Sequence, residues 1–316
     1  MIMKMILTTL LFLVFSTVLS QEATLAFLIK EKDIIAEGIT YDPNDQVFYL
    51  SSIHKKKVVS ISKKGQVADF ILPGQDSVQQ VLGMTVRNGK LWLCNNTPKH
   101  DTVFRQANLH VYDLRSKKLI NRFKLQDGTR HLFNDLYIMR NGEVYVTDSE
   151  AGTVYRIRTN SAILEELIPR GSLVYPNGIT ASEDESKILV STGSARGIVT
   201  INVHTQQIQE LPNNRFMTFG YDGLYRYKNT LIGVQNVLFP EAIHQMFVND
   251  TWTQTEALRY LSGNDSRFDI PTTGVVVDDS FYFIANSQLM QLRGSNGKIS
   301  NPGGLKETII LKLKLN

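Results

Sequence analysis

Apolar and polar residues alternate in short runs along most of the chain, a pattern that predicts β-strands rather than helices. Six segments repeat one arrangement: a residue that is polar in five of the six, then a glycine or aspartate, an apolar residue and an alternating run. A turn and a second apolar run follow. The segments begin at Glu37, Leu82, Asn134, Asn177, Asp222 and Thr273, at spacings of 45, 52, 43, 45 and 51 residues.

The turn falls at the same place in every segment. Two of these turns are Asn-Gly pairs between alternating runs, Asn88-Gly89 and Asn141-Gly142. Such a pair is the strongest short-range signal of a β-hairpin, because both central residues of a type I′ turn need a positive φ. We therefore expect a type I′ hairpin at both positions.

A repeat of about 40 to 50 residues with roughly four short strands is typical of a β-propeller blade. Six copies predict that residues 21–316 form an all-β protein, a six-bladed β-propeller. A long β-sandwich or a β-solenoid is the alternative, but a sandwich needs no sixfold register and a β-helix coil is shorter. The alternating runs 24–29 and 308–315 are expected to share the sixth blade, because pairing them removes an exposed sheet edge.

The first twenty residues have a different character. Lys4 is positively charged, residues 6–19 are almost entirely apolar, and the small residue Ser20 precedes the polar Gln21. This pattern predicts a signal peptide at residues 1–20 and a secreted or periplasmic mature protein. A retained anchor is the alternative, although the apolar stretch is short for a membrane span. No other long apolar run occurs, so no membrane span is expected after cleavage.

Composition and charge exclude several other classes of protein. Hydrophobic residues make up 42% and charged residues 20% of the chain, which excludes a collagen-like, coiled-coil or disordered protein. The net charge of +4 is not gathered into a long basic stripe, which argues against a nucleic-acid partner. The single cysteine, Cys94, cannot form an intramolecular disulfide, and its apolar neighbours predict that it is buried.

The first position of the repeated segments carries the candidate chemistry. The innermost strand of each propeller blade lines the central channel, so residues at one register of these strands converge in space. This register holds two carboxylates and two carboxamides: Glu37, Asp222, Asn134 and Asn177. Such hard oxygen ligands suit Ca²⁺ or another hard divalent cation, and no His or Cys occupies the register to favour Zn²⁺ or Cu²⁺. The alternative is that these side chains bond to backbone groups at the channel mouth.

Four motifs stand in separate segments: Glu37-Gly38-Ile39-Thr40-Tyr41-Asp42, Phe133-Asn134-Asp135, Tyr175-Pro176-Asn177-Gly178-Ile179 and Tyr221-Asp222-Gly223-Leu224. They resemble the family of SMP-30, gluconolactonase and luciferin-regenerating enzyme, and the related paraoxonase and strictosidine-synthase-like propellers. The resemblance implies a six-bladed propeller with a divalent ion, usually Ca²⁺, at the neck of the channel. It implies Glu37, Asn177 and Asp222 as metal ligands, and Asn134 as a ligand or a substrate contact. It also implies that Asp222 is the general base of a lactonase.

Two positions depart from the pattern of the family. Its sugar-lactone hydrolases carry an arginine two residues before the asparagine of Asn134-Asp135, where this chain has Leu132. Paraoxonases place a histidine at the mouth of the second blade, where this chain has Leu82. Both differences change the expected substrate contacts and leave the expected metal ligands in place.

These features lead to the hypothesis of a Ca²⁺-dependent hydrolase that acts on a small-molecule lactone or related ester at the channel mouth. The ion would stabilise negative charge on the scissile carbonyl oxygen, while the catalytic residues Asp222 and Asn134 would act on a water and hold the substrate. The loops 95–104, 236–240 and 263–271 are expected to set specificity. The alternative is a non-catalytic propeller that binds a ligand or protein and uses the ion only to tie its blades together.

Overall fold

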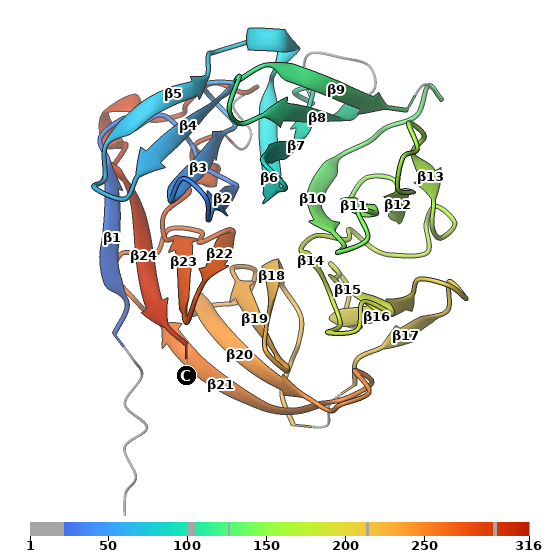
Figure 1. Cartoon of the computed structure of the whole chain (residues 1–316). Helices are drawn as coiled ribbons and strands as arrows, with labels where there is room; N and C mark the ends of the chain where they lie inside the picture. Colours follow the sequence, from blue (N-terminus) through green and yellow to red (C-terminus); the bar gives the residue numbers. More distant parts are fainter. Residues whose placement is uncertain (1–21, 100–104, 126, 213–214, 293–295, 316) are drawn as a thin grey trace, which may run out of the picture.

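The computed structural model describes residues 22–99, 105–125, 127–212, 215–292 and 296–315. These residues form six four-stranded antiparallel sheets arranged around a central axis (Figure 1). The prediction of an all-β, six-bladed β-propeller is therefore confirmed. The predicted signal peptide, residues 1–20, lies outside the described residues. Within the described part of the chain, no helix has the length and apolar character needed to cross a membrane.

Five blades consist of four consecutive strands that run from the channel outward. The first blade comprises β2 (Ile39–Asp42), β3 (Val47–Ser52), β4 (Lys57–Ser62) and β5 (Val67–Ile71). The second comprises β6 (Gln80–Arg87), β7 (Lys90–Asn96), β8 (Ala107–Asp113) and β9 (Leu119–Lys124). The third comprises β10 (Phe133–Ile138), β11 (Val144–Asp148), β12 (Thr153–Ile157) and β13 (Glu165–Glu166). The fourth comprises β14 (Ile179–Ala181), β15 (Lys187–Ser191), β16 (Ile198–Asn202) and β17 (Ile208–Glu210). The fifth comprises β18 (Tyr221–Tyr227), β19 (Thr230–Gln235), β20 (Ala242–Val248) and β21 (Thr255–Gly263).

The sixth blade joins the two ends of the described chain. It consists of β22 (Gly274–Val277), β23 (Ser280–Ile284), β24 (Thr308–Lys314) and, at its outer edge, β1 (Thr24–Ile29). Strands β1 and β24 are antiparallel, and the pairing runs from Thr24 opposite Lys312 to Ile29 opposite Thr308. The predicted closure is confirmed. The inner strands β2, β6, β10, β14, β18 and β22 also contact one another in sequence, and β22 contacts β2, so the ring is complete.

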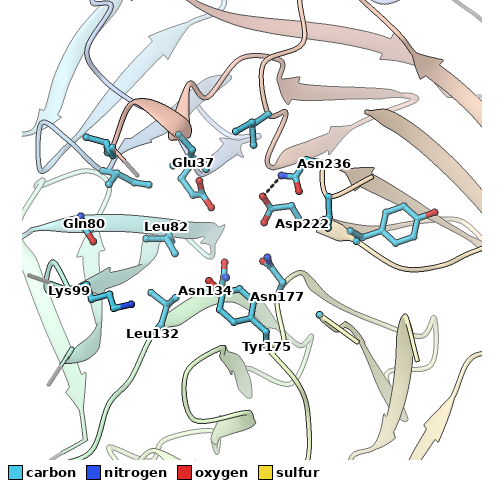
Figure 2. Close-up of a pocket in the computed structure, with 18 of the residues that line it drawn as sticks. Glu37, Gln80, Leu82, Lys99, Leu132, Asn134, Tyr175, Asn177, Asp222 and Asn236 are labelled. Carbon is cyan, nitrogen blue, oxygen red and sulfur yellow. Dashed lines mark hydrogen bonds between the residues drawn. The ribbon is translucent and has the colours of Figure 1, made fainter. Parts of the chain in front are cut away.

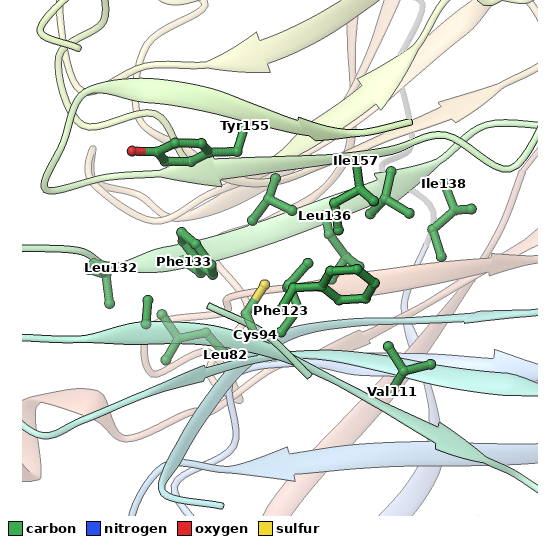
Figure 3. Packing of buried hydrophobic residues seen from close by; sticks show 14 of the residues in the cluster. Leu82, Cys94, Val111, Phe123, Leu132, Phe133, Leu136, Ile138, Tyr155 and Ile157 are labelled. Atoms are coloured by element: carbon green, nitrogen blue, oxygen red, sulfur yellow. The ribbon is translucent and has the colours of Figure 1, made fainter. Parts of the chain in front are cut away.

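The hydrophobic core is divided among the junctions between neighbouring blades. Six clusters of buried residues are found in the described part of the chain, and each one joins two adjacent blades. The cluster between the second and third blades contains Cys94, which is fully buried as expected, together with Phe133 and Tyr155 (Figure 3). Burial of apolar surface at every junction holds the inner strands at fixed positions around the channel.

The two Asn-Gly turns differ. Asn88 and Gly89 have φ of 51° and 69°, as a type I′ turn requires, so this prediction is confirmed. The prediction for Asn141-Gly142 is wrong, because only Gly142 has a positive φ. Asn141 Oδ1 instead accepts a hydrogen bond from the Glu143 amide at 2.9 Å, and the turn is longer, closed by Met139 N–H donating to Glu143 O. A side chain that bonds the backbone two residues ahead favours this alternative turn.

In the described residues, three short 3₁₀-helices lie in connecting segments. They are η1 (Gln75–Ser77), η2 (Leu289–Gln291) and η3 (Pro302–Gly304). Of these, η2 contributes to the site described below, because Leu289 lines the central cavity.

Candidate metal and substrate site

The inner strands depart from regular pairing at the register that the repeat singles out. In β6, β10 and β18 the pairing with the next strand shifts between residues 81 and 84, 133 and 136, and 221 and 224. In the other three blades the inner strand begins only after Glu37, Asn177 or Thr273. A break in the ladder lets a side chain leave the alternating in-and-out pattern of a strand. It is this break that allows the register residues to face the channel.

Five of the six register residues line one cavity of about 910 Å³: Glu37, Leu82, Asn134, Asn177 and Asp222. Figure 2 shows the four polar side chains directed toward a common space. Glu37, Asn134 and Asp222 are buried, with 6%, 5% and 7% of their surface exposed. The structure thus brings together the four predicted metal ligands, which come from the first, third, fourth and fifth blades.

The sixth register residue, Thr273, is placed differently. It lines a second cavity, of about 190 Å³, bordered by residues farther along the inner strands. Its hydroxyl group donates to the backbone oxygen of Glu37, and the Thr272 hydroxyl donates to the same oxygen. Thr273 therefore fixes the backbone that carries Glu37 rather than contributing a side chain to the large cavity.

Two of the glycines that follow the register residues permit a close approach of neighbouring blades. A Cβ atom on Gly38 would lie 2.2 Å from the backbone oxygen of Leu82, and one on Gly178 would lie 2.4 Å from that of Asp222. No real side chain tolerates such contacts. Glycine at these positions lets the inner strands pack tightly enough to bring their polar residues together.

The Asn134 amide is oriented by its neighbours. Its Nδ2 donates to Ser149 Oγ at 3.0 Å, and Ser149 Oγ donates in turn to the Pro176 backbone oxygen at 2.6 Å. Because Nδ2 is committed to Ser149, Oδ1 is the atom of this cavity-lining carboxamide that remains to bind a cation. Asn134 therefore presents an oxygen that could bind a cation.

Asp222 is held by a residue that the sequence pattern did not identify. Asn236, which follows β19, donates from Nδ2 to Asp222 Oδ2 at 2.6 Å and to the Pro271 backbone oxygen at 2.9 Å (Figure 2). Its loop was expected at the channel mouth, but nothing in the sequence shows which side chain of that loop returns to the inner strand. Charge-assisted hydrogen bonds of this kind fix a carboxylate firmly.

Other cavity residues also come from outside the repeated register. Lys99, Val237 and Ile270 belong to the three loops expected at the channel mouth, and all three line the cavity. Arg105, Tyr175 and the segment around η2 line it too and were not anticipated. The segment after η2 is rich in glycine, serine and asparagine, a composition that indicates a surface turn and gives no sign of a site.

The charges of Glu37 and Asp222 affect the ionisation of neighbouring groups. Partial burial raises the pKa of Tyr175, and the charges of Asp222 and Glu37 raise it further. Burial also raises the pKa of Asp135 to about 7, with a further contribution from the charge of Asp222. The fields of Glu37 and Asp222 thus overlap, and two nearby carboxylates in a buried site repel each other unless a cation lies between them.

The donor set fits a hard divalent cation. Two carboxylates can balance a charge of +2, while the Asn134 Oδ1 and the Asn177 amide oxygen add neutral ligands of the type that Ca²⁺ binds. Among the described residues, no group of three or more His, Cys, Asp or Glu side chains is placed to bind a metal. The fit therefore depends on mixed carboxylate and amide ligands, with coordination positions left for water or substrate.

His131 lies close to Asn134 in sequence but belongs to a separate network. Its Nδ1 bonds Asp148 Oδ2 at 2.6 Å and its Nε2 bonds Asp127 Oδ1 at 2.9 Å. Asp148 Oδ1 also accepts from the backbone amides of Leu132 and Ala151. Burial disfavours a charged imidazole here, but the hydrogen bonds and charges of the two aspartates outweigh it and raise the pKa of His131. The network anchors the segment that leads into β10.

A comparison with known protein families identifies the family to which this chain belongs. The family described as SMP-30/Gluconolactonase/LRE-like region matches residues 35–224, which include all four candidate ligands. The chain belongs to this family. Its membership agrees with the resemblance of the four short motifs. No curated protein matches this chain.

Solved structures with the same fold carry different functions. A gluconolactonase of Xanthomonas campestris has a TM-score of 0.62 at 15% identity, over 92% of this chain and 89% of that one. The major allergen Mala s 1 of Malassezia sympodialis has a TM-score of 0.68 at 16% identity, over 91% and 95%. Virginiamycin B lyase of Staphylococcus aureus has a TM-score of 0.59 at 16% identity, over 81% and 79%. At these identities the likeness establishes the fold alone, and function has to be argued from the site.

Proposed function

We propose that this family member is a Ca²⁺-dependent hydrolase of a small-molecule lactone or related ester. The observation that carries the proposal is the convergence of Glu37, Asn134, Asn177 and Asp222 in one cavity, with two of the four side chains fixed by neighbours. One structural neighbour, from Xanthomonas campestris, is a gluconolactonase, which agrees with this chemistry.

The proposed ligands of the ion are Glu37, Asn134, Asn177 and Asp222. When bound, the cation supplies positive charge that stabilises the negative charge developing on the carbonyl oxygen of the substrate. Asp222 acts as the general base that takes a proton from the attacking water. Its hydrogen bond from Asn236 keeps Oδ2 of the carboxylate in place beside the cavity that Asp222 lines. Asn134 positions the substrate.

The proposed location is outside the cytoplasm, secreted or periplasmic. Residues 1–20 carry the charged start, apolar core and small terminal residue of a signal peptide. Fractionation of the expressing cells, with amino-terminal sequencing of the purified protein, tests this. A mature protein that begins at Gln21 supports cleavage after Ser20, and an intact amino terminus contradicts it.

The test of activity uses the purified mature protein and a panel of lactones and aryl esters, each assayed with Ca²⁺ and after removal of metal by a chelator. Turnover that disappears with the chelator and returns with Ca²⁺ is the expected result. The alternative is a non-catalytic binding propeller with a structural ion. A Ca²⁺-dependent increase in melting temperature without turnover of any substrate in the panel would favour that alternative.

A further inference from the structure

One side of the large cavity is lined by aliphatic side chains from separate parts of the chain: Ile53, Leu82, Leu132, Leu289 and Leu292. Ile53, Leu82 and Leu132 are buried members of the hydrophobic cluster between the second and third blades, and Leu289 and Leu292 pack against that cluster. Figure 3 shows Leu82 and Leu132 at one end of this cluster, and Figure 2 shows both beside Asn134. This apolar wall is therefore a face of the core that borders the cavity.

Two of the polar side chains on the same side, Gln80 and Arg105, are occupied by contacts within the protein, and a third, Lys99, is exposed. Arg105 donates from Nη2 to Gln80 Oε1 at 3.3 Å and from Nε to the Thr97 backbone oxygen at 3.2 Å. Its Nη1 also lies 3.5 Å from Glu150 Oε1. Lys99 is exposed to solvent, where its ammonium group is hydrated. The wall thus remains a hydrocarbon surface rather than a set of groups prepared to bond a polyhydroxylated substrate.

The apolar wall lies beside the polar residues, and this arrangement indicates where each part of a ligand would bind. Leu82 and Asn134 occupy the same register of neighbouring blades, and Leu132 immediately precedes β10, the strand that carries Asn134. A substrate whose carbonyl group lies at Asn134 would place an attached substituent against these leucines. A cavity of about 910 Å³ is of the size that accommodates such a molecule.

We propose that the apolar wall is a subsite for a hydrocarbon substituent, so that the preferred substrate is an alkyl- or aryl-substituted lactone or ester rather than a sugar lactone. The inference rests on the proposed hydrolase function. Burying one methylene group against such a wall increases kcat/KM by about fourfold. The increase should continue along a homologous series until the wall is covered.

The experiment measures kcat/KM for γ-lactones that carry alkyl chains of increasing length, and for gluconolactone, with the mature protein in Ca²⁺. We expect a steep increase with chain length and poor turnover of gluconolactone. Leu289→Asn should lower kcat/KM for the longest lactone by about tenfold, the equivalent of one or two buried methylenes. Met290→Asn is the matched control, because Met290 is the next residue of η2 and is 53% exposed. It should retain the chain-length dependence of the wild type.

Leu132→Arg tests the same wall from the inner strand. It should weaken the chain-length dependence and improve turnover of gluconolactone relative to the alkyl lactones. Leu132 is buried, so the variant could fail to fold. In that case the pair Leu289→Asn and Met290→Asn decides the question alone, because both positions lie in a short surface helix.

Binding of the corresponding γ-alkyl lactams, which lack the labile ester bond, separates this inference from the proposed function. Affinity that increases with chain length and falls in Leu289→Asn supports the subsite even if no lactone is hydrolysed, and the hydrolase proposal then fails alone. Lactone turnover that does not depend on chain length, with lactam binding that is equally flat, overturns the subsite and leaves the hydrolase proposal standing.

Discussion

The side-chain amide of Asn236 lies 2.6 Å from Asp222 Oδ2 and, through the same nitrogen, 2.9 Å from the backbone oxygen of Pro271. It therefore links the inner strand of the fifth blade to the segment that leads into the sixth. Asp222 is the residue for which we propose both metal binding and proton transfer. Its geometry is thus controlled by a residue from a mouth loop.

Replacing Asn236 with alanine should reduce kcat by about tenfold or more, because hydrogen bonds to charged groups contribute about 1.5–3 kcal/mol. We expect Ca²⁺ affinity to change less than kcat, since Asn236 is not a proposed ligand, and saturating Ca²⁺ should not restore the rate. Steady-state kinetics at several Ca²⁺ concentrations make the comparison. Asn249→Ala, in a surface turn of the same blade, is the control. If Asn236→Ala kept the kcat and pH profile of the wild type, Asn236 would not be needed to position Asp222.

The two carboxylates should respond differently to neutralisation. Asp222→Asn keeps an oxygen ligand but loses the base, so turnover should fall by about 10²-fold or more even at saturating Ca²⁺. Glu37→Gln should act through weaker metal binding, and excess Ca²⁺ should restore much of its activity. Titration of both variants with Ca²⁺ measures the difference. If saturating Ca²⁺ fully restored the turnover of Asp222→Asn, Asp222 would be a metal ligand and not the general base.

Ser149 is predicted to support Ca²⁺ binding without contacting the ion. Ser149→Ala removes the acceptor that orients Asn134 Nδ2, and the loss of such a supporting contact weakens metal binding by about tenfold or more. Calorimetric titration with Ca²⁺ measures the affinity directly, without reference to catalysis. Ser116→Ala, on an exposed turn, is the matched control. Equal affinities for the two variants would show that Asn134 needs no such orientation.

Calcium should stabilise the folded protein. A ligand that binds only the folded state at about 100 times its Kd adds about 2.7 kcal/mol to the free energy of unfolding. For a domain of this size we expect an increase in Tm of about 4 °C. Differential scanning calorimetry with chelator and with added Ca²⁺ tests this. The combination Glu37→Gln with Asp222→Asn should abolish the shift, and a shift that persists would place the ion elsewhere.

The His131 network predicts a specific pH dependence of stability. Because the folded-state pKa of His131 is raised, its contribution is fully present below the unfolded value of about 6.5 and is lost as the pH increases through the folded value. The buried His110 and His244, whose pKa values are lowered to about 4, act in the opposite sense as the pH falls below about 6.5.

Denaturant unfolding of wild type and His131→Gln from pH 5 to pH 9 isolates the contribution of His131 to the free energy of unfolding, because the other histidines contribute equally to both proteins. The destabilisation caused by His131→Gln should be greatest at the acidic end and decrease as the pH rises. His204→Gln, at an exposed position, should show no such trend. A destabilisation by His131→Gln that is constant across this range would contradict the assignment.

The sequence by itself determined the number of blades, the closure of the ring and the register at which polar residues face the channel. These properties repeat at a period of about 40 to 50 residues or depend on local patterns, such as the alternation of a strand or the positive φ of Asn88-Gly89. Glu37, Asn177 and Asp222 could be singled out because the fold turns one repeated position into one point in space.

Tertiary structure decided the rest. The alternative turn at Asn141, the return of Asn236 to Asp222 and the orientation of Asn134 by Ser149 each depend on which partner lies within hydrogen-bonding distance. The apolar wall joins leucines from the second blade, the third blade and a short helix more than 150 residues later in the chain. No repeat or periodicity in the sequence encodes these contacts. They form only when packing of the blades against one another has fixed every loop around the channel.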